Sequence, residues 1–328
     1  MDTAFLIRTV VSNTRWNSAE DLIKLIKQVG NTIEKVRPVE LCIGNIVRRI
    51  LHMVREEFRD MDTDEQQDED EDSRPATPID SSMYNLLADI SNIQINYDVE
   101  KYSLKAVVIQ GINVIIDELE TLNNNIAAQS LEHIHSNEII MTLGYSKCVL
   151  EFLLAVGKKR KFQVVVAETS PTFFGQRMAL ELSQGGIETT LITDSAVFAL
   201  MARVNKVILG CHVVTADGGL LAIGGTRLMA TAAKHYSTPV VVITGMYKLS
   251  PIYPYDHNVL NTFTDPSPLL PFSENVLSSK IDVINPMFDC VSPDLIDLFI
   301  TNLGGNPPSY IYRLLDEHYD SCDYRLNP

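Results

Sequence analysis

Two pairs of glycines are the residues whose spacing first suggests a ligand site. Gly218-Gly219 and Gly224-Gly225 fall between an expected strand and an expected helix, which is where open α/β sheets bind their ligands. The sequence contains no GxxxxGK[ST] loop, and no GxGxxG sequence follows a strand, so the common phosphate-binding motifs are absent. Tight turns also require glycine, and we favour that interpretation.

His133 and His135 are the second candidate, because two histidines two residues apart could bind a metal from one strand. The sequence offers no third ligand at a suitable spacing, so a hydrogen-bonded structural role is the better prediction. The five cysteines are scattered and form no CxxC pair, which indicates reduced thiols rather than a zinc site. No GxSxG or HExxH sequence is present. We therefore expect no metal and no cofactor.

Charge is unevenly distributed along the chain. The net charge is −15, but nine acidic residues lie between positions 60 and 72 with no base among them, and without them the charge is about −6. A mildly acidic chain lacks the basic face that a polyanion requires, so we expect no direct binding of nucleic acid. The acidic run and the Pro-containing stretch after it predict a disordered loop at about 60–79. We interpret this loop as a solvated insertion rather than a docking motif.

The hydrophobic pattern predicts an N-terminal helical domain over residues 1–126. Apolar residues recur at spacings of three and four over 17–30, after Pro38 and over 104–126, as they do in amphipathic helices. No apolar run approaches the ~18 residues needed to span a bilayer, so we expect a soluble protein without membrane contact. The basic residues 158–161 fall where a later helix should end, and cations there complement the helix dipole.

Residues 127–328 have a different hydrophobic pattern, in which short apolar strands are expected to alternate with helical segments. The expected strands are 138–142, 162–167, 188–193, 206–209 and 239–244. This alternation predicts an α/β fold with a Rossmann-like, open, mainly parallel sheet and helices on both faces. Near the C-terminus, Ser292-Pro293-Asp294 and Pro307-Pro308-Ser309 each predict the start of an apolar helix. These two segments are either buried or in contact with another subunit.

Several strings of residues resemble a known family. They are Arg15–Glu20, Asn125–Gln129, His133–Glu138, Val204–Ile208 and Asn302–Arg313. In this order they resemble the regulatory subunits of eukaryotic translation initiation factor 2B, and the beta branch rather than alpha or delta. The likeness runs over about residues 10–320, apart from the acidic loop and a segment at about 255–268. It implies a helical N-terminal domain followed by a Rossmann-like domain.

The resemblance also implies a function and partners. In this family the alpha, beta and delta subunits form a regulatory core, and gamma and epsilon form the part that exchanges GDP for GTP on initiation factor 2. The whole assembly is a decamer of two pentamers. We therefore expect a non-catalytic regulatory subunit in the cytosol. Its expected partners are the alpha, gamma, delta and epsilon subunits and the alpha subunit of initiation factor 2, whose phosphorylation the core senses. The candidate interface residues are His133, His135, Ser136, Asn137, Glu138, Asn306, Tyr310 and Tyr312.

The family shares its fold with isomerases of methylthioribose-1-phosphate and ribose-1,5-bisphosphate. We can therefore ask whether the catalytic and phosphate-binding residues of those enzymes are present here. Their Thr-His-Cys string matches Thr142-Leu143-Gly144, which has no thiol, and their Ala-Asn-Gly-Asp string matches Ala216–Gly219, which lacks the final carboxylate. Asp217 lies two positions earlier. Their phosphate-binding Arg becomes Ser170, and an Asn-Lys pair becomes Ala222-Ile223. Without these groups proton transfer and phosphate capture are not expected. A sugar-phosphate isomerase and a small-molecule-sensing scaffold remain the alternatives.

Overall fold

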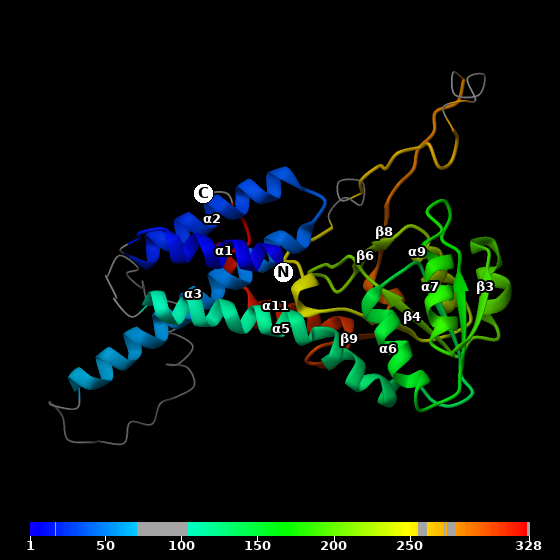
Figure 1. The fold of residues 1–328 in the computed structure, drawn as a ribbon, viewed down its shortest axis with the longest axis horizontal. Coiled ribbons are helices and arrows are strands. Elements are labelled where there is room, and N and C mark those ends of the chain that lie inside the picture. The colour runs from blue at the N-terminus through cyan, green and yellow to red at the C-terminus, as the bar shows by residue number, and fades with distance from the viewer. Residues whose placement is uncertain (17, 71–103, 255–260, 272, 274–279, 327–328) are drawn as a thin grey trace. The chain divides into compact units, whose positions relative to one another are not determined.

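A computed structural model describes residues 1–16, 18–70, 104–254, 261–271, 273 and 280–326 (Figure 1). The chain divides into two compact units. One contains Met1–Pro38, Ile46–Asp117 and His318–Pro328, and the other contains Val39–Asn45 and Glu118–Glu317. The domain boundary that the sequence places near residue 126 stays a prediction.

The N-terminal part is helical, as the apolar spacing predicts. Its helices are α1 (Asp2–Asn13), α2 (Ala19–Val36), α3 (Leu41–Asp70) and α5 (Leu104–His133). The Ser18 side chain caps α2 by accepting the Asp21 N–H at 3.3 Å. The helix continues past Gly30, where a Cβ would lie 2.7 Å from Val47 Cγ1. Glycine at this position therefore permits close packing of α2 and does not end it.

The disordered loop predicted from about residue 60 is wrong at its start, because α3 continues to Asp70. Each residue added to an existing helix gains a backbone hydrogen bond, which offsets the low helix propensity of the five aspartates in this segment. The remainder of the predicted loop lies outside the described residues.

The second unit is built on a sheet of the predicted mainly parallel type. Its strand order is β10-β9-β7-β4-β1-β2-β3, and every neighbouring pair is parallel except β10 and β9. The strands are β1 (Ile139–Leu143), β2 (Gln163–Ala167), β3 (Glu188–Ile192), β4 (Lys206–Gly210), β7 (Val240–Ile243), β9 (Leu298–Thr301) and β10 (Gly304–Asn306). A smaller antiparallel sheet contains β5 (Val213–Val214), β6 (Leu220–Ile223) and β8 (Phe288–Val291).

Helices cover both faces of the large sheet (Figure 1). They are α6 (Lys147–Gly157), α7 (Phe174–Gln184), α8 (Val197–Met201) and α9 (Thr226–His235). Helix α11 (Ile311–His318) follows β10 along the chain. One buried cluster joins α6 and α7 to strand residues such as Val164 and Ile208. A second joins α8 and α9 to residues such as Met141 and Val207, which point to the opposite face. No helix in the described ranges combines the length and apolar character that a membrane span requires.

The helix predicted from Ser292 is wrong. A short 3₁₀ turn, η3 (Pro293–Leu295), is followed by strand β9 (Leu298–Thr301), which pairs with β7 inside the sheet. A short apolar run is compatible with a buried helix or a buried strand, and burial between β7 and β10 stabilises the strand. The helix predicted after Pro307 is present as α11.

Candidate functional site

Open α/β sheets usually bind their ligands at the carboxyl edge of the parallel sheet. Here Gly144 stands at the position of the catalytic cysteine of the isomerases, and neighbouring side chains pack against it. Gly144 follows β1 with a φ of +67°, and its N–H donates to Thr169 Oγ1 at 2.9 Å. A Cβ at Gly144 would lie 3.3 Å from Ile223 Cγ2. The apolar Ile223 side chain therefore packs against this position, where the resemblance places a lysine in the isomerases.

The position of the enzymatic carboxylate is also closed. A Cβ added at Gly219 would approach the backbone oxygen of Val291 to 2.8 Å, so a larger side chain requires a backbone shift. The carboxylate of Asp217 does not replace it. Its Oδ1 accepts the Thr215 hydroxyl at 2.6 Å and the Gly219 N–H at 3.0 Å, and these bonds hold the side chain within its own turn.

The position at which the isomerases bind phosphate carries no positive charge in this chain. Ser170 stands where the isomerases carry Arg, and its N–H donates to Asp194 Oδ2 at 2.7 Å. The neighbouring Thr169 N–H donates to Asp194 Oδ1 at 2.9 Å. These amides already bind a carboxylate, and a phosphate next to Asp194 would be repelled. The carboxyl edge thus lacks the thiol, the carboxylate and the cation of the isomerase chemistry.

The amino edge of the sheet is different, because several predicted interface residues are ordered there. The loop between α5 and β1 leaves His135, Ser136 and Asn137 exposed. The carboxylate of Glu138 accepts the His135 N–H at 3.0 Å and lies 3.7 Å from Lys206 Nζ. Lys206 also donates to the backbone oxygen of His133. One partly buried cation, Lys206, therefore holds both ends of the exposed loop.

Two further residues fix this loop and were missed by sequence reasoning. The Arg160 guanidinium donates to the backbone oxygen of Leu131 at 2.7 Å and to that of Ile134. Asn205 Oδ1 accepts the N–H of Ile139 at 2.8 Å. Arg160 belongs to the basic cluster that we interpreted through the helix dipole, so its role as a loop anchor had no local signal. Asn205 lies within one of the strings that carry the resemblance.

His133 packs close to an aromatic side chain of α6. Its ring lies 6.5 Å from that of Phe152, and burial together with the positive charge of Lys206 lowers its pKa. No cluster of three or more His, Cys, Asp or Glu suitable for a metal occurs in the described part of the chain. A Cβ at Gly305 would lie 3.8 Å from His133 Cε1. The string ending at Glu138 and the string containing Gly305 therefore meet at this edge.

The remaining predicted residues follow Gly305 along the chain. Asn306 ends β10 and is half-buried. Tyr310 is half-buried in the turn before α11, with Arg313 5.6 Å from its ring centroid. Tyr312 lies on α11 with 62% of its surface exposed. These tyrosines belong to a separate element from the loop at 134–138.

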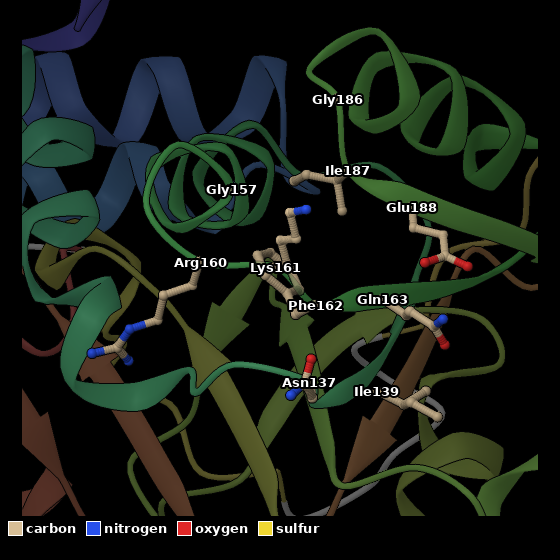
Figure 2. A pocket seen from close by; sticks show the side chains of 10 residues that line it. All are labelled: Asn137, Ile139, Gly157, Arg160, Lys161, Phe162, Gln163, Gly186, Ile187 and Glu188. Carbon is tan, nitrogen blue, oxygen red and sulfur yellow. The ribbon is translucent and has the colours of Figure 1, made fainter.

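A pocket of about 490 Å³ opens at the amino ends of β1, β2 and β3 (Figure 2). Its lining residues are Asn137, Ile139, Gly157, Arg160, Lys161, Phe162, Gln163, Gly186, Ile187 and Glu188. Figure 2 shows the Arg160 side chain turned away from the other lining side chains, in agreement with its bonds to the loop. Asn137, with a φ of +66°, donates its N–H to the Lys161 backbone oxygen at 2.8 Å and joins the loop to this pocket.

Comparison with known proteins gives the same assignment over nearly the whole chain. The model of the initiation factor 2 subunit family matches residues 1–308. A translation initiation factor eIF2B subunit beta from Dictyostelium discoideum is 45% identical, over 98% of this chain and 90% of that protein. A ribose 1,5-bisphosphate isomerase from Archaeoglobus fulgidus is 28% identical over 89% of this chain and 94% of its own.

Solved structures agree with the sequence comparison. A chain in the crystal structure of the tetrameric eIF2B-beta2-delta2 complex from C. thermophilum superposes with a TM-score of 0.70 and 27% identity, over 97% of this chain and 87% of that one. The chain therefore belongs to the initiation factor 2 subunit family and, within it, to the eIF2B beta subunits.

Proposed function

We propose that this chain is a regulatory, non-catalytic subunit of the exchange factor that acts on initiation factor 2, and that it controls GDP/GTP exchange and so translation initiation. The observation that carries the proposal is the replacement of the isomerase's reactive groups at the carboxyl edge. A relative matched over 89% of this chain and 94% of its own is an isomerase, but here Gly219 has no room for a carboxylate and Ile223 packs against Gly144. Fold alone does not fix function, and the likeness to eIF2B beta subunits favours a role through binding to other proteins.

The partners follow from the family. The related C. thermophilum complex contains beta and delta subunits, and we propose the delta, alpha, gamma and epsilon subunits as partners here, in a decamer located in the cytosol. Catalysis of exchange would reside on another subunit. The chain would contribute to binding of the alpha subunit of initiation factor 2. Regulation would then be a difference in binding free energy between two assembly states, which phosphorylation of that subunit changes.

We propose the amino edge as the main partner surface. The exposed residues His135, Ser136 and Asn137 lie on a loop that Arg160 and Lys206 hold in place. A loop ordered before binding loses less conformational entropy when it binds. The adjacent pocket of about 490 Å³ offers room for a side chain of the partner. Tyr310 and Tyr312 are proposed as contacts on the neighbouring segment.

The direct experiment is co-expression with the other subunits, followed by capture of the complex and a GDP-release assay on initiation factor 2. We expect this chain to co-purify, and its omission to weaken the response to the phosphorylated factor. Failure of the purified core to bind initiation factor 2 would sink the proposal.

Two assays address the alternatives. Conversion of ribose 1,5-bisphosphate by the isolated chain would favour an isomerase. A thermal shift with sugar phosphates or nucleotides, in the absence of any subunit binding, would favour a small-molecule sensor.

A further inference from the structure

Strand β3 ends the large sheet on one side, and its outer edge is open. The strand order places β3 next to β2 alone, and Figure 1 shows it at the margin of the sheet unit. Its register with β2 runs without interruption from Gln163 and Glu188 to Ala167 and Ile192, so the strand has no bulge. No strand in the described ranges pairs with its other side. An open edge of this kind is a template for a further strand.

The backbone groups on the outer edge belong to Thr189 and Leu191. The Glu168 N–H donates to the Ile192 oxygen at 2.9 Å, so the backbone groups of Ile192 face β2. Successive residues of a strand direct their N–H and C=O groups to alternate sides. The groups of Thr190 therefore also face β2, whereas those of Thr189 and Leu191 face away from it. Each of these two residues presents one donor and one acceptor outward.

The edge carries none of the features that usually protect an open strand. Proteins place lysine or proline on such edges, or distort them with a bulge. Residues 187–193 contain no lysine, arginine or proline, and their one charged residue is Glu188. Leu191 is 45% exposed, and Thr190 is exposed as well. Because β-branched and apolar residues favour strand pairing, this edge is suited to being covered in the assembled protein.

The edge matches a second copy of itself. A two-fold axis at Thr190 would make two β3 strands antiparallel and would place Thr189 of each copy opposite Leu191 of the other. These are the residues with outward groups, so each such pair would form two backbone hydrogen bonds. Glu188 would lie opposite Ile192, and the two Glu188 residues would be roughly 13 Å apart along the strands, beyond the screening length at physiological salt. No like charges would face each other.

The opposite edge of the sheet is a poorer match for β3. Strand β10 has three residues, two of which are glycines, and Gly304 has a φ of +137°, so this edge is short and irregular. Pairing of β3 with β10 of another copy would also be a head-to-tail contact, which leaves further edges open and leads to extended arrays. A contact between two β3 strands is complete with two copies.

We propose that two copies of this chain join through their β3 strands into one continuous sheet, antiparallel about Thr190. The inference rests on the proposed function, because a decamer of two pentamers contains two copies of the chain. The contact is small, since its backbone hydrogen bonds come only from Thr189 and Leu191 of each copy. We therefore expect the isolated chain to form dimers at high concentration that dissociate on dilution.

The test is Leu191→Pro in the full chain, measured by sedimentation velocity over a range of concentrations. Proline removes the outward N–H of Leu191, and an edge strand tolerates proline where the N–H faces solvent. The variant should keep the unfolding midpoint of the wild type and self-associate at least about tenfold more weakly, because each dimer loses two hydrogen bonds. The matched control, Leu191→Val, keeps the N–H and should dimerise as the wild type does. A monomeric wild type, or equal dimerisation of Leu191→Pro, would overturn the proposal.

Amide hydrogen exchange of the wild type is a second measurement, which does not require any variant to fold. The amides of Thr190 and Ile192 face β2 and should exchange slowly at every concentration. The amide of Leu191 should exchange quickly in the dilute protein and slowly in the concentrated protein. Fast exchange of Leu191 in the dimer would show that the copies meet elsewhere.

The same exchange measurement on the co-expressed complex separates this contact from the proposed function. Wild-type chain that co-purifies with no other subunit contradicts the proposed function itself. A complex that forms, but in which the Leu191 amide still exchanges quickly, contradicts the β3 contact alone.

Discussion

Arg55 and Asp323 form a two-bond ion pair in which the carboxylate is completely buried. Arg55 Nε and Nη2 donate to Asp323 Oδ2 and Oδ1 at 2.8 and 3.0 Å, and Lys27 Nζ lies 2.8 Å from Oδ1. Paired donors of this kind bind a carboxylate strongly and fix its orientation. The pair joins α3 to the C-terminal tail, which belongs to the helical unit.

We predict that Asp323→Ala destabilises the helical unit by about 3–5 kcal/mol, because the buried Arg55 and the neighbouring Lys27 then lose the carboxylate that they share. Urea unfolding followed by circular dichroism measures this change. The control is Arg313→Ala, which breaks the exposed pair with Glu317 and should leave the midpoint unchanged. A fully stable Asp323→Ala protein would show that the tail does not stabilise the unit.

Arg160→Met should loosen the loop at 134–138. The substitution leaves the backbone oxygens of Leu131 and Ile134 without their donor, at a cost of about 1–3 kcal/mol. Amide hydrogen exchange of His135 and Asn137 should become faster, and binding of the partner subunit should weaken. Lys159→Met, an exposed neighbour in the same basic cluster, is the control and should change neither. Unchanged exchange in Arg160→Met would show that the loop is ordered by other contacts.

Much of the sheet was predictable, because β1, β2, β4 and β7 are buried apolar runs separated by helices. The smaller sheet was not predictable. Strand β5 has two residues, and β6 pairs with β8 through Leu220 and Val291, which are far apart in the sequence. Strand β9 was taken for a helix, because its short apolar run has no distinguishing period.

In the candidate site too, residues within one stretch of sequence could be identified, whereas contacts between distant residues could not. The string His133–Glu138 was found by resemblance, and the glycines at 218–219 were correctly interpreted as turn residues, with a φ of +82° at Gly218. The residues that hold this loop in place, Arg160 and Lys206, could not be identified from the sequence. Lys206 Nζ and the His133 oxygen are joined across 73 positions of sequence, and no local pattern records such a contact.

Stability should fall with acid partly through His133. Burial and the charge of Lys206 lower the pKa of this ring in the folded protein, so the unfolded chain binds more protons below the ordinary histidine pKa of about 6.5. The contribution of His133 is present at pH 7.5 and is lost as the pH falls below that value and through the lower pKa of the folded protein. Urea midpoints at pH 7.5 and 5.5 should therefore differ less in His133→Gln than in the wild type. An equal pH dependence in both proteins would contradict the assignment.

Alkylation should separate the cysteines by burial. Burial raises the pKa of Cys42 to about 11 and also raises the pKa of Cys148 and Cys211, so few of these thiols ionise at pH 8. Cys322 is exposed. Peptide mass spectrometry after brief iodoacetamide treatment should find Cys322 modified first. Early modification of Cys211 in the folded protein would show that its surroundings open to solvent.

Restoring the enzymatic residues should not restore an enzyme. Gly219→Asp places a side chain whose Cβ would meet the Val291 oxygen at 2.8 Å, and overpacking of this kind costs about 1–3 kcal/mol. Gly144→Cys adds strain, because a φ of +67° is unfavourable for residues with a Cβ. Ile223 would still occupy the position of the lysine. We expect a destabilised double variant with no turnover of ribose 1,5-bisphosphate. The control is Gly224→Ala, where a Cβ would lie 3.7 Å from the nearest atom, the Pro286 oxygen, and the backbone has no positive φ. Measurable product from the double variant would show that the carboxyl edge still binds ribose 1,5-bisphosphate, which contradicts the proposed loss of this site.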